Sequence, residues 1–246
     1  MITVNPAGWH KDLARAVAPW EISISPEALE DFQVYMDELQ KWSPRASLTS
    51  LRDCREIALG HFADSLAALL VSEIFSLKEG RAIDVGTGAG FPGLPLRILR
   101  PGWSLCLLEA TRKKSDFLRA IVTALELRSV EVMRARSEEA AHERDYREGF
   151  DLAFSRALAA FPVVLELCLP FLRVGGYLVA HRGRNGTEEA REAARALSEL
   201  GGEIKEIQGY QIKGLEGIRT LICVRKMART HERYPRRVGI PSKRPL

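Results

Sequence analysis

The sequence contains little cysteine and no signal-peptide pattern. Its four cysteines lie far apart in the chain, and no two of them form a C-x-x-C pair. This spacing argues against a disulfide framework and against a structural zinc site. The N-terminal stretch MITVNPAGWHKDL lacks the apolar core of a secretory signal peptide. We therefore expect a reduced, cytoplasmic protein without a bound metal.

Long apolar runs are missing as well. The most apolar helix candidate, FPVVLELCLPFL at residues 161–172, is too short to cross a bilayer and contains Glu166 and Pro170. We expect no membrane segment and no membrane partner. The 246 residues are 46% hydrophobic and 28% charged, which is typical of a globular protein and excludes a disordered or collagen-like chain. We expect a monomer.

Acidic residues are scarce at the C-terminal end. Residues 225–246, RKMARTHERYPRRVGIPSKRPL, contain eight basic residues and one acid, Glu232, so they carry +7. Because the whole chain carries +4, the first 224 residues carry −3. The prolines argue against a regular helix or an inner strand.

This basic end has three interpretations. It can be a solvated, disordered tail, as charge runs usually are. Tyr234 and several prolines interleave with the arginines, however, a mixture that suits phosphate contacts and stacking on looped RNA. We therefore favour nucleic acid as the partner. The third interpretation is that the segment packs back on the body and shapes the active site.

Two helical patterns precede a series of alternating strands and helices. The segment 25–42 has Ser25 as its N-cap and Pro26 at the first helical position, and the segment 55–71 places apolar residues on one stripe. Apolar strands near 81–85, 104–109, 130–135, 150–155 and 176–182 then alternate with helices near 93–99, 111–125, 160–172 and 187–200. This alternation predicts a parallel sheet that helices cover on both faces.

The end of the pattern differs. Two further strands, 203–212 and 219–226, are joined only by KGLEGI, and so short a link forces antiparallel pairing. We thus predict an α/β fold with a mostly parallel seven-stranded sheet and an antiparallel terminal strand. The expected regions are an N-terminal helical cap within the same globular unit (1–75), a ligand-binding domain (76–226) and a basic tail (227–246).

A glycine-rich loop follows the first predicted strand. Residues 82–93 read AIDVGTGAGFPG, and glycine lets a backbone turn tightly and approach a ligand because it has no Cβ. Gly88, Gly90 and Gly93 match the dinucleotide spacing G-x-G-x-x-G. Taken alone, the loop also fits a tight turn without a ligand.

The predicted layout and two acidic residues favour S-adenosyl-L-methionine (AdoMet) over NAD. A parallel sheet with an antiparallel strand at its end is typical of AdoMet-dependent methyltransferases, whereas the NAD domain is all parallel. Asp84, just before the glycine loop, is an unfavourable neighbour for a pyrophosphate but a good one for the cationic methionine end of AdoMet. Glu109 closes the second strand, 25 residues later, where an acid can accept hydrogen bonds from ribose hydroxyls.

Six motifs resemble those of the RsmG family, also called GidB, whose members methylate a guanine of bacterial 16S ribosomal RNA. The motifs are SLTS (47–50), HFADSL (61–66), DVGTGAGFPGLPL (84–96), RKKSDFL (112–118), SRALA (155–159) and RYPRRVGIPSKRPL (233–246). The family usually has Asn-Leu-Thr where this chain has Ser47, Leu48 and Thr49, which weakens any role for an asparagine there. The resemblance implies a Rossmann-like class I methyltransferase fold, AdoMet as the donor, and N7 of a guanine in the 16S rRNA of the small ribosomal subunit as the acceptor.

The resemblance also implies a set of cofactor contacts. Gly86 and Gly88 let the loop approach the methionine portion, and the pair Ser137 and Glu138 can reach the adenine edge, although it also fits a capped helix start. Arg156 lies at the end of a strand, where such sheets bind ligands; it could equally be solvated in a loop. The expected cofactor-binding residues are Gly86, Gly88, Phe91, Glu109, Ala110, Thr111, Ser137, Glu138 and Arg156.

The expected chemistry needs no general base. Guanine N7 has an in-plane lone pair and no proton to lose, so alignment and electrostatics suffice, and we assign no catalytic residue. His61 and Asp64 are predicted to form a structural hydrogen-bonded pair, and His181 to touch RNA. Because N7 must stay free, we expect recognition through the Watson–Crick edge and stacking of a splayed-out base. Arg112, Lys113 and Lys114 could also meet phosphates. The main RNA-binding candidates are Arg182, Arg184, Arg233, Arg236 and Arg237.

Three other functions fit parts of the sequence. An NAD-dependent dehydrogenase would bind NADH and need a proton-handling residue. A small-molecule methyltransferase would turn over without RNA and leaves the basic end unexplained. A non-catalytic RNA-binding module would bind RNA and no cofactor.

Overall fold

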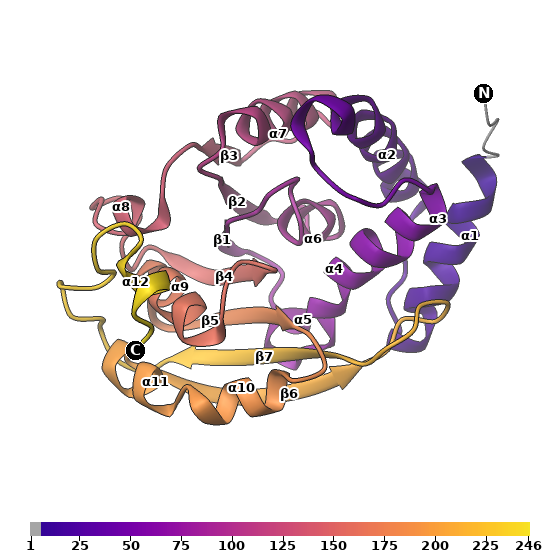
Figure 1. The fold of residues 1–246 in the computed structure, drawn as a ribbon. Coiled ribbons are helices and arrows are strands. Elements are labelled where there is room, and N and C mark those ends of the chain that lie inside the picture. Colours follow the sequence, from indigo (N-terminus) through magenta and orange to yellow (C-terminus); the bar gives the residue numbers. More distant parts are fainter. Residues whose placement is uncertain (1–5) are drawn as a thin grey trace.

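Within residues 6–246, seven strands form a single twisted sheet, and helices cover both of its faces (Figure 1). The structure is a computed structural model that describes residues 6–246. The strand order is β3-β2-β1-β4-β5-β7-β6. The strands are β1 (Gly80–Val85), β2 (Trp103–Leu108), β3 (Val130–Met133), β4 (Phe150–Arg156), β5 (Leu172–Arg182), β6 (Gly202–Tyr210) and β7 (Arg219–Lys226).

The strand directions agree with the prediction. All pairs among β1 to β5 are parallel, whereas β7 is antiparallel to both β5 and β6. The predicted mostly parallel sheet with an antiparallel terminal strand is therefore confirmed. The strand order reverses between β1 and β4, and sheets of this kind bind ligands at the carboxyl ends of the strands beside such a reversal.

Helices precede, connect and follow the strands. They are α1 (Pro6–Val17), α2 (Pro26–Ala46), α3 (Cys54–Ile57), α4 (Asp64–Leu66), α5 (Ser72–Ser76), α6 (Gly93–Leu99), α7 (Arg112–Ala124), α8 (Ser137–Ala140), α9 (Phe161–Cys168), α10 (Gly186–Glu192), α11 (Ala194–Leu200) and α12 (Ile240–Lys243). The predicted start of α2 is correct, because the Ser25 hydroxyl accepts a hydrogen bond from the Ala28 amide at 3.2 Å.

Two apolar cores lie on opposite faces of the sheet. Successive strand residues point to opposite faces, so Ala82 and Leu107 enter the first core and Ile83 and Leu108 the second. The first core includes the N-terminal helices with α6 and α7, and the second includes α9 and α11. Because both faces are covered, the inner strands are apolar almost throughout rather than alternating.

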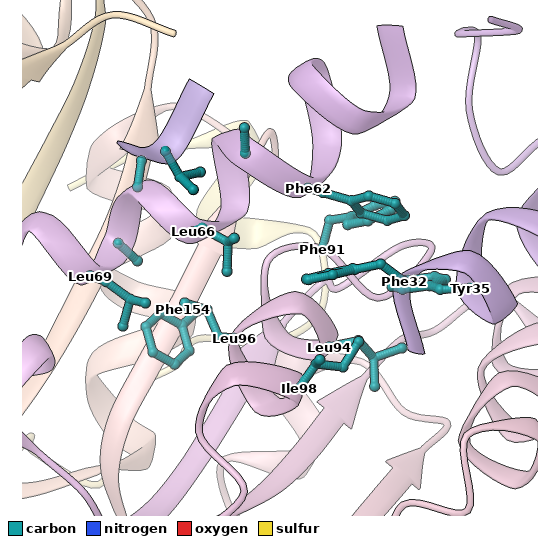
Figure 2. Close-up of a cluster of buried hydrophobic side chains, with 14 of the residues drawn as sticks. Phe32, Tyr35, Phe62, Leu66, Leu69, Phe91, Leu94, Leu96, Ile98 and Phe154 are labelled. Carbon is teal, nitrogen blue, oxygen red and sulfur yellow. The ribbon is translucent and has the colours of Figure 1, made fainter. Parts of the chain in front are cut away.

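The second predicted helix is interrupted. Residues 55–71 contain α3, a π-helical turn at Ala58–Ala63, α4 and a 3₁₀ turn at Ala67–Leu70. The predicted apolar stripe is nevertheless buried, and Figure 2 shows Phe62 of this stripe beside Phe32, Tyr35 and Phe91. π-helical turns are frequent at functional sites, and this one contains His61.

Three other helical segments differ from the prediction. Helix α1 was not predicted, yet Trp9, Leu13, Ala16 and Val17 bury one of its faces. The helix predicted over 160–172 ends at Cys168, and β5 begins at Leu172. The helix predicted over 187–200 is divided at Ala193 into α10 and α11.

The basic tail is packed on the body, so its interpretation as a solvated, disordered end is wrong. Tyr234 is 3% exposed and belongs to the second core. Arg236 forms an ion pair with the fully buried Glu166 at 2.6 Å. Arg147 donates hydrogen bonds to the carbonyl oxygens of Thr230 and Tyr234, each at 2.9 Å. The structure thus favours the interpretation that the segment packs back.

Lys226, the last residue of β7, is buried where the tail begins. Its ammonium donates to the carbonyl oxygens of Leu169 and Leu200 at 3.0 and 3.1 Å, and to the Thr230 hydroxyl. These carbonyls lie at the carboxyl ends of α9 and α11, where a positive charge is favourable. Burial nevertheless lowers the pKa of Lys226 to about 7.

We expect Lys226 to make folding stability depend on pH. Its pKa is lower in the folded protein than the ordinary 10.5, so the unfolded chain binds more protons between these values. Wild-type stability should therefore rise with pH above about 7, by up to about 1.4 kcal/mol per pH unit, relative to Lys226→Met. Urea unfolding of both proteins between about pH 7 and 9.5 tests this. The difference between their free energies of unfolding cancels the contributions of the titrating groups that both proteins share. A difference that stays constant over this range would contradict the prediction.

Candidate active site

The glycine loop between β1 and α6 has a backbone that glycine alone adopts easily. Gly86, Gly88 and Gly90 have φ values of +69°, +63° and +98°, in or beside the left-handed region. A Cβ on Gly86 would lie 2.4 Å from Cδ1 of Leu158. At Gly86 the loop is therefore packed so closely that a side chain would not fit.

Asp84 lies beneath the glycine loop, and its contact with the methionine end of AdoMet stays a prediction. Its carboxylate is fully buried beneath the loop, where it accepts hydrogen bonds from the Thr87 hydroxyl at 2.6 Å and the Gly93 amide at 2.8 Å. Burial raises the pKa of Asp84 to about 6, although both hydrogen bonds act in the opposite direction. The oxygen Oδ2 thus holds the two ends of the loop together, while Oδ1 has no hydrogen-bond partner among residues 6–246.

Glu109 joins the glycine loop to the segment after β2. One carboxylate oxygen accepts from the Gly88 amide at 3.1 Å and the other from the Thr111 amide at 2.6 Å. These two bonds fix the orientation of the carboxylate. A carboxylate has further lone pairs, so Glu109 can still accept hydrogen bonds from a ligand.

A cavity of about 330 Å³ lies beside this carboxylate; we call it the glycine-loop pocket. Lys114, for which phosphate contact and a solvated helix start were both open, also lines it. Leu158 and Ser242, which were not predicted to bind the cofactor, line it too. The structure brings six of the predicted cofactor residues to this pocket: Gly86, Glu109, Ala110, Thr111, Ser137 and Glu138.

The other three predicted cofactor residues lie outside the lining of this pocket. Gly88 turns the loop and binds Glu109, as described above. Phe91 is 5% exposed and stacks on Tyr35 with ring centroids 5.2 Å apart. The Arg156 guanidinium lies 5.1 Å from the Phe91 ring centroid. Phe91 and Arg156 therefore hold the loop in place through these contacts, without lining the pocket.

A second cavity, of about 490 Å³, adjoins the first; we call it the arginine pocket. Arg156, Arg182 and Arg219 line it, and Asp64 is the single acidic residue of its lining in the described part of the chain. Both pockets are bordered by residues 157–159, which follow β4. Ala157 has φ of +51°, a conformation that is uncommon for residues other than glycine and is found at functional sites.

Arg156 organises the polar groups between the pockets. It forms an ion pair with Asp64 at 2.8 Å, donates to the Gly60 carbonyl at 3.1 Å and contacts Nδ1 of His61 at 3.0 Å. His61 and Asp64 thus both bind Arg156 rather than each other, which corrects the predicted pair. His181 is largely buried, and its Nε2 lies 3.1 Å from the Asp64 carbonyl.

Charges at this site are fixed near neutral pH. Burial, assisted by the nearby Arg156 charge, lowers the pKa of His61 to about 4. Burial also lowers the pKa of His181 to about 4. Burial works to raise the pKa of Asp64, but the charge of Arg156 and the side-chain hydrogen bonds from Tyr210 and Arg156 bring it below its usual value. The two histidines are therefore neutral and Asp64 is charged.

The five RNA-binding candidates fall into two groups. Arg182 pairs with Glu189, Arg233 pairs with Glu199 at 3.3 Å, and Arg236 pairs with Glu166. Arg184 and Arg237 are exposed and form no ion pair with any residue of 6–246. Arg233 is exposed as well, but it carries an ion pair. Contact with RNA remains a prediction for all five.

Neither a metal cluster nor a membrane span is found in the described part of the chain. Among residues 6–246, no three His, Cys, Asp or Glu side chains are grouped so that they could hold a metal ion. None of the helices described here has the length and apolar character needed to cross a membrane.

Comparisons with known proteins identify the family. The family model for rRNA small subunit methyltransferase G (GidB) matches residues 28–219. Ribosomal RNA small subunit methyltransferase G of Desulfitobacterium hafniense is 42% identical over 226 residues, which are 92% of each chain. The protein of the same name from Roseiflexus castenholzii is 40% identical over 235 residues, or 96% of this chain and 99% of that one.

A solved structure shares the fold. TYW2 from M. jannaschii, crystallised with AdoMet, superposes with a TM-score of 0.50 at 13% identity, over 68% of this chain and 76% of its own. The predicted Rossmann-like class I methyltransferase fold is confirmed. Because the family model covers most of the sequence and these relatives match nearly end to end, the chain belongs to the rRNA small subunit methyltransferase G (GidB) family.

Proposed function

We propose that this protein transfers the methyl group of AdoMet to N7 of a specific guanine in the 16S rRNA of the small ribosomal subunit. The observation that carries the proposal is the pair of adjoining pockets that share residues 157–159 as a border. A donor in the glycine-loop pocket would lie next to an acceptor in the arginine pocket. Membership of the family supports ribosomal RNA as that acceptor.

The residues of the glycine-loop pocket fit AdoMet. Gly86 leaves the space that a Cβ would fill, and the oriented carboxylate of Glu109 suits the hydroxyls of a ribose. Leu108, Leu158 and Leu167 provide an apolar lining for the flat adenine ring. When bound, AdoMet supplies an electrophilic methyl group on a sulfonium.

The arginine pocket suits an RNA acceptor. Its three arginines outnumber its one acidic lining residue, so its charge attracts phosphates that flank the acceptor base. The arginines are held in place, because Arg156 and Arg219 pair with Asp64 and Arg182 pairs with Glu189. Guanine N7 needs no deprotonation. The protein therefore only has to hold the base so that N7 faces the methyl group of the donor.

The proposal places the protein in the cytoplasm, where ribosomal RNA is modified. Residues of one chain form both pockets, so a monomer suffices. NAD is a poorer fit than AdoMet, because the antiparallel β7 departs from the all-parallel sheet of the NAD domain. A small-molecule acceptor would leave the cationic lining without a partner.

The decisive experiment is incubation of the protein with labelled AdoMet and ribosomal RNA or small subunits, followed by mapping of the modified base. We expect a single methylated guanine that needs RNA and AdoMet together. Turnover without RNA would favour a small-molecule methyltransferase. RNA binding without AdoMet binding would favour a non-catalytic module, and binding of NADH instead would favour a dehydrogenase.

We expect Gly86→Val and Glu109→Gln to weaken AdoMet binding without unfolding the protein. The valine would collide with Leu158 at a left-handed backbone position, and the glutamine would present a donor to an amide that now donates. The loss should be about 1.5–3 kcal/mol, or roughly 10- to 100-fold in Kd. Calorimetric titration measures it, with Glu203→Gln on exposed β6 as the control. Unchanged affinity in both variants would exclude this site.

We expect the rate of methyl transfer to change little with pH. The pKa values of His61 and His181 are about 4, so both stay neutral above pH 6.5. The pKa of Asp84 is about 6, so its ionised fraction rises only from about three quarters to nearly one over the same range. Single-turnover rates with AdoMet bound and RNA saturating should vary by less than about threefold between pH 6.5 and 8.5. A tenfold rise per pH unit would reveal a general base.

A further inference from the structure

The end of the tail forms part of the glycine-loop pocket. Ser242 lines this pocket, although more than 130 residues separate it from Glu109 and Thr111. The Gly239 amide donates a hydrogen bond to Oε1 of Glu138 at 3.0 Å, and Glu138 lines the same pocket. Figure 1 shows α12 beside α9 at this side of the sheet, and α12 packs against α9. The cofactor site is therefore completed by the last residues of the chain.

Buried contacts hold this segment in one position. Arg236 donates to both carboxylate oxygens of Glu166, through its side chain and its backbone amide. Pro241 is buried, and Leu246 packs against the second core. Arg236 also donates to the Arg244 carbonyl at 2.8 Å, which ties the two ends of the segment together.

The outer side of the same segment is positively charged. Arg237, Lys243 and Arg244 are exposed, and none of them pairs with an acidic residue of 6–246. Lys114 and Arg136 contribute further positive charge to the lining of the pocket. An RNA backbone that reaches the active site thus meets cations on the element that closes the cofactor site.

We propose that residues 236–246 are a wall of the cofactor site that also binds RNA phosphates, so that RNA and AdoMet strengthen each other's binding. A phosphate held by Arg237 and Lys243 stabilises the segment in the position in which Gly239 contacts Glu138 and Ser242 borders the pocket. AdoMet binding needs that same position. By linkage, each ligand then raises the affinity for the other by the same factor. This inference rests on the proposed function.

The wall is tested first with AdoMet alone. A chain that ends at Val238 lacks Ser242 and the Gly239 contact but keeps the pair of Arg236 with Glu166. Gly239→Pro removes the same amide donor in the full chain, and a proline cannot adopt the Gly239 φ of +79°. Both should bind AdoMet at least about tenfold more weakly than wild type, which corresponds to the loss of one charge-assisted hydrogen bond or more.

The control for this test is Gly217→Pro, which changes another left-handed glycine outside both pocket linings. It should keep wild-type AdoMet affinity. Thermal unfolding confirms that each variant is folded. If wild type binds AdoMet and the truncated chain and Gly239→Pro bind it equally well, the wall does not exist. If wild type itself fails to bind AdoMet, the proposed function is wrong instead.

The coupling is tested with S-adenosylhomocysteine, which has no methyl group to transfer. In wild type, 16S rRNA should tighten its binding by about fivefold or more. The double variant Arg237→Glu/Lys243→Glu should lose the tightening, so that its affinities for S-adenosylhomocysteine with and without RNA become equal. Its log–log salt slope for RNA should also fall by about 1.5, since two phosphate contacts are lost.

Lys205→Glu, at an exposed position on β6, provides the matched charge control and should retain the tightening. The coupling is disproved if RNA leaves the wild-type affinity for S-adenosylhomocysteine unchanged. The coupling is also disproved if RNA tightens the binding of S-adenosylhomocysteine to the double variant as much as to wild type.

Discussion

The ion pair between Arg156 and Asp64 connects the N-terminal helices to the sheet and to the glycine loop. Arg156 ends β4, Asp64 begins α4, and the two side chains are 14% and 10% exposed. The same guanidinium binds the Gly60 carbonyl and stacks on Phe91. Breaking a buried pair by removing one partner costs about 3–5 kcal/mol. The contact thus fixes the π-helical turn against the end of β4 and shapes the arginine pocket, which both side chains line.

This arrangement also explains why the site contains histidines but no apparent base. Burial and the adjacent arginine keep His61 and His181 neutral at physiological pH. Asp64 is charged but already accepts from Arg156 and Tyr210. With pKa values of about 4 the two histidines are weak bases at neutral pH, and Asp64 is a weaker one still, so none of these groups is suited to take a proton from a substrate. A fixed set of charges suits the methylation of guanine N7, because that reaction asks for orientation and loses no proton before the methyl group is transferred.

The sequence predicts the elements that depend on local pattern. The strands, the capped start of α2 and the glycine loop follow from apolar periodicity, Ser25 and the glycine spacing. The direction of the Asp84 side chain does not follow from such a local pattern, because it depends on which face of the sheet each residue of β1 points to. Asp84 shares its face with Ala82, so it points into the first core beneath the loop. The spacing of Trp9, Leu13 and Val17 on one helical face would have predicted helix α1.

The order of the tail could not be predicted, because its partners lie elsewhere in the sequence. Glu166 is an acid in the apolar helix α9, and a buried acid without a partner is very costly. That cost implies a cation from a distant segment, but the sequence does not say which one. The tail provides Arg236 for Glu166, and it provides the Thr230 hydroxyl for the buried Lys226.

The tail is therefore ordered by the charges that the body buries and not only by apolar residues of its own. This separates its basic residues into two kinds. Arg236 neutralises a buried acid and has little capacity left for RNA, whereas Arg237, Lys243 and Arg244 remain on the surface. A segment of net positive charge can thus be a fixed part of the protein and still face a polyanion. From the sequence alone, an ordered tail and an RNA-binding tail are alternatives. In the structure they are compatible, because different residues of the tail fix its position and face the solvent.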